Sequence, residues 1–141
     1  MLPGVNRPPD YLDFTADAEG ISFPDGTQAS DPSSVRLPDG TWLMAMSLGQ
    51  QTLMARSTDG LAFTREATLS LGGVPDLALL TDGSLRLYVC AQGIVSYRST
   101  DGGHGWTRET TVVPPGFNGK PIVCDPSLVA GAGLFVFKTG S

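Results

Sequence analysis

Two short sequence elements alternate along this chain, and their spacing limits its fold more than any other feature. The first is a proline that opens a short apolar stretch, at Pro32, Pro75 and Pro126. The second is a Ser-x-Asp turn followed by an aromatic residue, with its aspartate at Asp59 and Asp101. The first two prolines are 43 residues apart and the two aspartates are 42 apart. A repeat of this length is typical of folds built by stacking one supersecondary unit.

Each repeat predicts four short antiparallel strands, because apolar stretches alternate with Asp-Gly and Gly-Gln turns in which glycine can take positive φ. No stretch has the period of an amphipathic helix. The predicted strands are Val35–Leu37, Thr41–Ser47, Thr52–Ser57 and Leu61–Glu66, then Asp76–Leu80, Ser84–Cys90, Ile94–Ser99 and Trp106–Val112. Partial repeats add strands at Tyr11–Thr15, Gly20–Phe23, Asp125–Ala130 and Gly133–Lys138.

Four antiparallel strands per repeat predict an all-β fold and, within it, a β-propeller. Residues 1–141 form a single propeller segment in this interpretation. Residues 31–66 and 74–113 are full blades, and 10–24 and 124–139 are half blades. A propeller needs about four blades to close. The chain is therefore expected to be a fragment of a five- or six-bladed propeller, or to be completed in a homodimer by strand exchange.

The charge balance excludes some classes of partner. The net charge is −5 and only 16% of residues are charged, so no basic surface is expected for nucleic acid or for anionic membranes. No apolar run reaches the ~20 residues of a membrane span, and Met1–Tyr11 lacks the apolar segment of a signal peptide. Localisation stays open. Cys90 and Cys124 are interpreted as buried thiols, with a disulfide as the alternative.

The two Ser-x-Asp turns resemble the Asp box of the sialidase (neuraminidase, BNR-repeat) superfamily. In that family the box is a hairpin turn on the outer side of a blade, away from the active site. The resemblance therefore implies a structural role for the matching residues. They are Ser57, Asp59, Gly60 and Phe63 in the shorter variant, and Ser99, Asp101, Gly103 and Trp106 in the full motif.

The Asp-Pro pairs resemble the five-bladed arabinanase and β-fructosidase glycosidases. There such a pair opens the innermost strand of a blade and places a carboxylate in the central funnel. Asp31 and Asp125 match that position. Val74 replaces the aspartate in the middle repeat, but Asp76 lies two residues on and shares its strand face. The resemblance makes Asp31, Asp76 and Asp125 candidate catalytic residues, and the alternative is that they cap backbone N–H groups at strand starts.

The catalytic set of a glycosidase is incomplete in this sequence. Hydrolysis needs a second carboxyl group as general acid, and Glu66 and Glu109 follow the turns, where a solvated position is expected. Arg56 and Arg98 recur 42 residues apart, which predicts a repeated structural contact, such as one to a carboxylate. If the chain is an enzyme, the resemblance implies an exo-sialidase-like or arabinanase-like glycosidase.

The expected ligand is a carbohydrate in the central funnel, and the alternative is a non-catalytic propeller that binds glycan or protein. Phe117, Asn118 and Lys120 lie in the loop before the third inner strand and are predicted substrate contacts at its rim. His104 is the sole histidine and has no partner at ligand spacing, so no metal site is expected. No cofactor is expected, although a structural or funnel-bound cation stays open.

Overall fold

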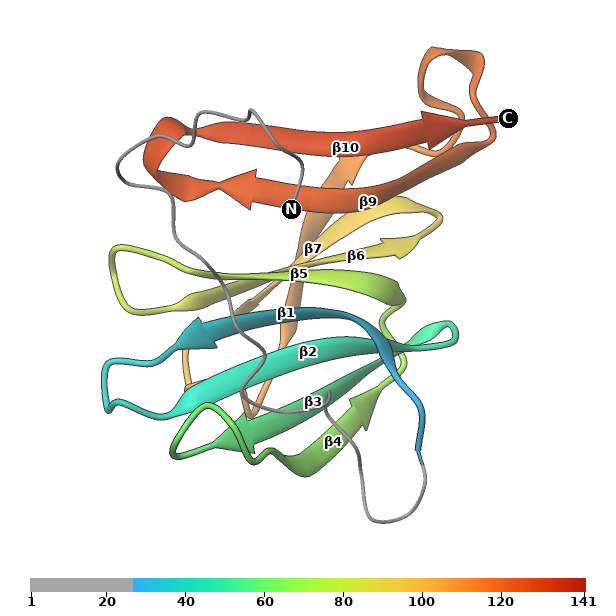
Figure 1. Ribbon diagram of the computed structural model, residues 1–141. Coiled ribbons are helices and arrows are strands. Elements are labelled where there is room, and N and C mark those ends of the chain that lie inside the picture. Colours follow the sequence, from blue (N-terminus) through green and yellow to red (C-terminus); the bar gives the residue numbers. More distant parts are fainter. Residues whose placement is uncertain (1–26) are drawn as a thin grey trace, which may run out of the picture.

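The apolar stretches of the repeat form strands because tight turns with Asp-Gly sequences bound them. The computed structural model describes residues 27–141 (Figure 1). Its strands are β1 Ser30–Arg36, β2 Trp42–Leu48, β3 Gln51–Ser57, β4 Thr64–Leu69, β5 Gly73–Leu79, β6 Leu85–Ala91, β7 Gly93–Ser99, β8 Thr107–Val113, β9 Ile122–Val129 and β10 Leu134–Gly140. Two short 3₁₀ helices, Phe117–Gly119 (η1) and Ala130–Ala132 (η2), interrupt the connections on either side of β9.

The turn between the first two strands has the same construction in both full repeats. Gly40 adopts a φ of 89° between β1 and β2, and Asp39 accepts hydrogen bonds from the backbone and hydroxyl of Thr41 at 2.9 and 2.7 Å. Asp82 does the same for Ser84 between β5 and β6, at 3.0 and 2.6 Å. Because these turns are short, each apolar strand is forced to pair with its immediate neighbour in sequence.

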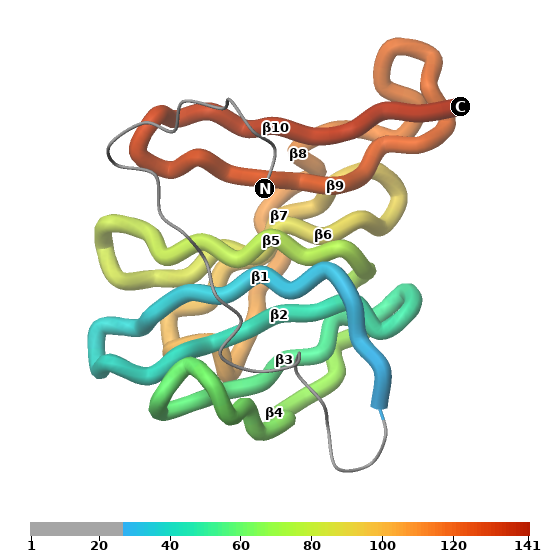
Figure 2. Tube along the Cα trace, in the orientation of Figure 1, coloured from blue at the N-terminus to red at the C-terminus, as the bar shows by residue number. Residues whose placement is uncertain are grey.

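The strands form three antiparallel sheets in chain order. The first sheet is β1-β2-β3-β4, the second is β5-β6-β7-β8, and the third described sheet is the hairpin β9-β10. β1, β5 and β9 lie side by side along one edge of the stack, as Figures 1 and 2 show. The all-β prediction is confirmed, and within residues 27–141 no sheet closes on itself.

Apolar side chains fill the spaces between successive sheets. β2 is buried on both faces, so its sequence is apolar at consecutive positions rather than at alternate ones. Leu43 and Met54 of the first sheet pack against Leu87 and Val95 of the second in the first core cluster. A separate cluster joins the second sheet to the hairpin β9-β10, and it includes Tyr88, Ile94, Val113 and Val123.

The inner strands begin earlier than the sequence predicts. The prediction starts them at Val35, Asp76 and Asp125, but β1 begins at Ser30, β5 at Gly73 and β9 at Ile122. The physical reason is a β-bulge at each proline, where the pairing register shifts. A bulge accommodates a residue that has no N–H to donate, so the strand continues through it.

The start of β4 also differs from the prediction, and the early start of β9 has a local consequence. β4 starts at Thr64 rather than Leu61, because the turn after β3 extends to Phe63. The loop before β9 is shorter than predicted, since β9 already starts at Ile122. The predicted strands Tyr11–Thr15 and Gly20–Phe23 lie outside the described residues.

A disulfide joins Cys90 of β6 to Cys124 of β9, so the interpretation as two thiols is wrong. The repeat explains why these residues meet. Ser47 occupies the position of Cys90 in the first sheet, and its hydroxyl accepts a hydrogen bond from the Val74 N–H at 2.5 Å. In both sheets, the sixth residue of the second strand therefore contacts the first strand of the next sheet. The spacing of the two cysteines in the sequence did not predict that they would pair.

Candidate functional site

Three residues that precede the repeat prolines share an unusual backbone conformation. Asp31 has a φ of 52°, Val74 of 44° and Asp125 of 52°, all in the left-handed region. That region is unfavourable for most residues, and especially for a β-branched one such as valine. The three strands that carry these residues lie side by side. Asp31, Val74 and Asp125 therefore form a row across the inner strands, called the inner row below.

The two aspartates of the inner row are open to solvent. Asp31 is exposed and its carboxylate accepts a hydrogen bond from the Ser30 hydroxyl at 2.9 Å. Asp125 is also exposed, and the Lys138 ammonium lies 3.6 Å from its Oδ2 atom. Each carboxylate thus keeps unused acceptor capacity, which a ligand rich in hydroxyl groups could fill.

The third predicted carboxylate, Asp76, lies in a different environment. It is half-buried, and its Oδ2 atom accepts a hydrogen bond from the Leu128 N–H of β9 at 2.8 Å. Its Oδ1 atom accepts one from the Ser33 hydroxyl of β1 at 3.3 Å. Burial raises the pKa of Asp76, and the two hydrogen bonds oppose this rise. Asp76 therefore ties three inner strands together, much as the capping alternative expects.

The tie made by Asp76 has a counterpart one repeat earlier. Ser33 occupies the equivalent position in β1, directly after Pro32, and its hydroxyl accepts a hydrogen bond from the Leu77 N–H of β5 at 2.9 Å. Leu77 and Leu128 are themselves equivalent, each two residues after a proline. Each inner strand is therefore linked to the next one by the side chain that follows its proline.

A pocket of about 420 Å³ reaches the start of β9, next to Asp125, although no residue of the inner row lines it. Cys124, the neighbour of Asp125 in β9, lines it together with Pro115 and Pro121 of the loop before β9. Gln50 and Gln92, from the turns that follow β2 and β6, supply side-chain amides. Sequence analysis missed these glutamines. Their position in equivalent turns of the repeat was the signal that could have found them.

Of the three predicted rim residues, one is packed in the core and two are exposed. The Phe117 ring packs edge-on against Phe137, with ring centroids 5.4 Å apart, so it belongs to the core between the second sheet and the hairpin. Asn118 and Lys120 are exposed, and Asn118 has a left-handed φ of 53°. The loop therefore borders the pocket, although none of these three residues lines it.

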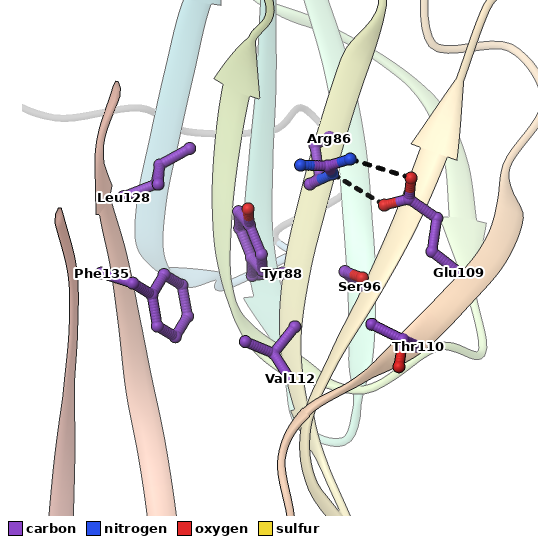
Figure 3. A pocket seen from close by; sticks show the side chains of 8 residues that line it. All are labelled: Arg86, Tyr88, Ser96, Glu109, Thr110, Val112, Leu128 and Phe135. Carbon is purple, nitrogen blue, oxygen red and sulfur yellow. Dashed lines mark hydrogen bonds and ion pairs between the residues drawn. The ribbon is translucent and has the colours of Figure 1, made fainter. Parts of the chain in front are cut away.

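A second pocket of about 310 Å³ lies between the second sheet and the hairpin (Figure 3). Its lining is polar on one side, where the Arg86 guanidinium binds both carboxylate oxygens of Glu109 at 2.7 and 3.0 Å. Tyr88 and Phe135 supply the aromatic part, with ring centroids 4.8 Å apart. The hydrogen bonds from Arg86 lower the pKa of Glu109. This pocket is called the intersheet pocket below.

Both glutamates that were expected to be solvated are exposed, and each is also in an ion pair with an arginine. Glu66 is bound by Arg56 at 2.6 and 3.2 Å, and Glu109 by Arg86. Arg56 and Arg98 each contact a carboxylate, as predicted, but the contact is not repeated, since Arg98 pairs with Asp82 and not with the equivalent of Glu66. Arg56 also donates to the Gly102 carbonyl of the second sheet at 2.9 Å. Neither glutamate is free to act as an acid on a ligand at the inner row.

The two Ser-x-Asp turns join the third strand to the fourth in each full sheet. In the first turn, Asp59 accepts hydrogen bonds from the backbone of Leu61 and Ala62 at 2.8 and 2.9 Å and from the Ser57 hydroxyl at 2.8 Å. These donors lower the pKa of Asp59 to about 2. Gly60 has a φ of 79°, and Phe63 packs against the second core cluster, which includes Met44.

The second turn is built in the same way. Asp101 accepts from the Ser99 hydroxyl at 2.7 Å and from the backbone of Gly105 at 2.9 Å, and its pKa is lowered. The Trp106 indole donates to the Gly103 carbonyl at 3.1 Å. A Cβ atom at Gly103 would lie 2.5 Å from the Leu43 side chain, so glycine is needed where this turn meets the first sheet. Both aspartates use their carboxylates to hold the turn.

No protein-family model matches the sequence, and no curated protein or solved structure matches it. Within the described part of the chain, no three His, Cys, Asp or Glu side chains are grouped as metal ligands. Residues 27–141 also contain no helix of the length and apolar character needed to cross a membrane.

Proposed function

We propose that the three sheets are successive blades of a β-propeller and that the ends of their inner strands bind carbohydrate. The connection from an outer strand to the next inner strand, β4 to β5 and then β8 to β9, is the one that a propeller requires. The repeated ties through Ser33 and Asp76 also link only neighbouring inner strands, as they would around a central axis. The likeness of the two turns to the Asp box supports the same architecture.

The observation that carries the ligand class is the inner row, together with the pocket of about 420 Å³ that Cys124, the neighbour of Asp125, helps to line. Asp31 and Asp125 have the same backbone conformation and exposed carboxylates, and the pocket adds the amides of Gln50 and Gln92. Carboxylates and amides are the side chains that satisfy the many hydroxyl groups of a sugar. That set of side chains supports the proposal that carbohydrate binds at this end of the strands.

Hydrolysis of the bound carbohydrate would go one step further than binding. A glycosidase of the sialidase or arabinanase kind would use Asp31 and Asp125 on the substrate, with a general acid as its second carboxyl group. Asp76 has the raised pKa that suits an acid, but both of its oxygens accept hydrogen bonds from neighbouring strands. Glu66 and Glu109 are in ion pairs. The described residues therefore favour the second candidate, a propeller that binds glycan or protein without turnover.

The disulfide bears on where such a protein would work. Cys90–Cys124 joins the second sheet to the hairpin, and disulfides persist chiefly in oxidising compartments. We therefore place the proposed activity outside the reducing cytosol, in a secreted or periplasmic setting. Recovery of the oxidised protein from culture medium or periplasm would support this, whereas a fully reduced pair in purified native protein would contradict it.

Calorimetric titration tests the ligand and the site together. Sialyllactose and arabino-oligosaccharides are titrated into the full chain and into the Asp31→Asn and Asp125→Asn variants. Each substitution is expected to weaken binding about tenfold, or about 1.4 kcal/mol. Asp39→Asn is the matched control, because Asp39 lies in the turn at the other end of β1 and its amide can still accept from Thr41.

Three outcomes decide between the versions. Turnover of chromogenic sialosides or arabinofuranosides that Asp31→Asn abolishes would support hydrolysis. Binding without turnover would support the non-catalytic propeller. Binding that is unchanged in both aspartate variants, or no binding by any sugar of the panel, would remove the inner row as the site.

A further inference from the structure

The Cys90–Cys124 disulfide is within reach of small molecules. Both cysteines are half-buried, and both line the pocket of about 420 Å³ at the start of β9. This pocket is called the disulfide pocket below. Its volume lies in the range of cavities that hold small-molecule ligands. A reagent that enters it therefore meets the disulfide without disturbing the core between the sheets.

The walls of the disulfide pocket carry no charge among the described residues that line it. They include the side-chain amides of Gln50 and Gln92 and the ring of Pro115. The intersheet pocket differs in both respects, because no cysteine lines it and the ion pair of Arg86 and Glu109 does. A thiol that enters the disulfide pocket as its anionic thiolate therefore meets no like charge inside it.

Thiol–disulfide exchange is the reaction that such a site supports. The sulfur of an incoming thiolate bonds to one cysteine sulfur, the Cys90–Cys124 bond breaks, and the released sulfur takes up a proton. A second molecule of the thiol then displaces the first, which leaves two cysteine thiols and an oxidised small-molecule disulfide. Access to the sulfur atoms limits this exchange, and exposed disulfides are the ones that react reversibly.

Other contacts hold the hairpin β9-β10 to the second sheet on either side of the disulfide. Before Cys124, Val123 is buried in the core cluster that includes Tyr88. After it, the Leu128 N–H donates to the Asp76 carboxylate at 2.8 Å. Neither contact involves the sulfur atoms. Opening of the bond is therefore expected to leave the hairpin attached and to change only the segment between these two contacts.

The first interface between sheets shows what a reduced Cys90 would do. Ser47 occupies the position of Cys90 there, and its hydroxyl accepts a hydrogen bond from the Val74 N–H at 2.5 Å. Val74 and Asp125 are equivalent, since each precedes a repeat proline. A free Cys90 sulfur, which is a weak acceptor, is thus placed to accept from the Asp125 N–H. The two repeats display a hydrogen-bonded and a covalent closure of the same interface.

The exchange acts on one residue of the inner row. Asp125 directly follows Cys124, at the bulge where the register of β9 and β10 shifts between Val136 and Lys138. A bulge interrupts the ladder locally, so the backbone can adjust there without loss of the pairing on either side. With the bond closed, Asp125 is held to β6 through its neighbour. With the bond open, its own N–H takes over that contact.

From this arrangement we propose that Cys90–Cys124 is a thiol-exchange site. A low-molecular-weight thiol enters the disulfide pocket, opens the bond and shifts the backbone at Asp125, while the three sheets stay folded. The closed form is the one expected in an oxidising compartment, and the open form follows exposure to the thiol. The proposal does not depend on what the inner row binds.

The rate of reduction by glutathione tests whether the bond is reached in the folded chain. The oxidised full chain is incubated with glutathione, its free thiols are alkylated at intervals, and the products are counted by mass spectrometry. The rate in native buffer is expected to lie within about tenfold of the rate in denaturant, because the sulfur atoms are accessible. A bond reached only through global unfolding would react at least about a thousandfold more slowly, and that result would overturn the proposal.

A pocket-filling variant tests the route of the thiol. Ala91 is exposed and lines the disulfide pocket, so Ala91→Trp is expected to slow reduction in native buffer at least about fivefold by limiting access. Ala62→Trp is the matched control, because Ala62 is an exposed alanine in the turn between β3 and β4. An unchanged rate in Ala91→Trp would show that the thiol arrives by another path, and it would remove the pocket as the site.

Amide NMR of the oxidised and reduced chains tests the structural consequence. The resonances of Cys124 and Asp125 are expected to shift most, while the Leu128 N–H keeps its protection from hydrogen exchange because Asp76 still accepts from it. Cys90→Ser/Cys124→Ala imitates the open form and is expected to reproduce the shift at Asp125. Loss of the Leu128 protection on reduction would show that the bond holds the hairpin in place. That result, or an Asp125 resonance that does not move, would overturn the proposal.

Discussion

The Asp76 carboxylate accepts a hydrogen bond from the Leu128 N–H at 2.8 Å, across 52 residues of sequence. This single contact joins the second sheet to the hairpin at their inner edge. The equivalent contact, from Leu77 N–H to the Ser33 hydroxyl, joins the first sheet to the second. The inner edge is thus held by polar contacts at the same level, while apolar side chains hold the faces of the sheets.

The Asp76→Ala substitution tests this tie. It leaves the half-buried Leu128 N–H without its acceptor, so the free energy of unfolding is expected to fall by about 1–3 kcal/mol in urea titrations. Asp76→Asn keeps an acceptor and is expected to cost less. Asp125→Asn, at an exposed carboxylate, serves as the control and should change stability by less than about 0.5 kcal/mol. Equal stability of Asp76→Ala and the parent would rule out the tie.

The disulfide is expected to carry a large part of the stability. Opening Cys90–Cys124 removes a constraint on a sequence separation of 34 residues, for which loop entropy gives about 2–4 kcal/mol. Thermal unfolding of Cys90→Ala/Cys124→Ala measures this loss. Cys90→Ser/Cys124→Ala should recover a part of it, because a hydroxyl at position 90 could accept from the next inner strand as Ser47 does from Val74. If the two variants unfold at the same temperature, a hydroxyl at position 90 does not stabilise the fold as the Ser47 hydroxyl is expected to do.

Val74 offers a stabilising substitution. Its φ of 44° is strained for a β-branched residue, whereas asparagine tolerates the left-handed region well. Val74→Asn is therefore expected to raise the free energy of unfolding by about 1 kcal/mol. Val74→Ile keeps the branched Cβ and is expected to bring no such gain. A lower stability of the asparagine variant would mean that packing of the valine outweighs its backbone strain.

The acid limit of stability depends on the turn aspartates. The pKa of Asp59 in the folded chain is about 2, below its ordinary value of 3.8. The folded state therefore gains stability from ionised Asp59 above pH 3.8, and this gain is lost as the pH falls through 2. Carboxyl resonances followed by NMR should show Asp59 titrating near pH 2 and Asp76 above 3.8, because burial acts in the opposite direction there.

Removal of a donor extends the pH test. In Ser57→Ala, the pKa of Asp59 is expected to rise, since one of its hydrogen bonds is lost. An Asp59 resonance that titrates at the same pH in this variant would show that the backbone donors alone set its pKa.

Strand order was accessible from the sequence because short turns leave little freedom. The Asp39-Gly40 and Asp82-Gly83 turns bound apolar stretches in both full repeats, so each strand had only its neighbour to pair with. Strand starts were harder. Proline usually ends a ladder, but Pro32 lies inside β1 at a bulge, and a one-letter pattern does not separate a bulge from a boundary.

The candidate site was only partly accessible. The repeat placed Asp31 and Asp125 at equivalent positions, and the structure adds their shared backbone conformation and exposure. The sequence repeat alone could not distinguish these two aspartates from Asp76. The hydrogen bonds of the Asp76 carboxylate come from residues 43 and 52 positions away in the sequence. The partners of Glu66 and Glu109 were hidden for the same reason, since register across strands decides which arginine they meet.

The link between Cys90 and Cys124 also determines how the chain would respond to a pulling force. Tension applied at the two ends passes from β6 to β9 through the sulfur atoms and bypasses β7, β8 and the loop after them. Those residues cannot extend while the bond is intact, which withholds about 120 Å of contour length. The oxidised chain would therefore yield over a shorter distance than the reduced one.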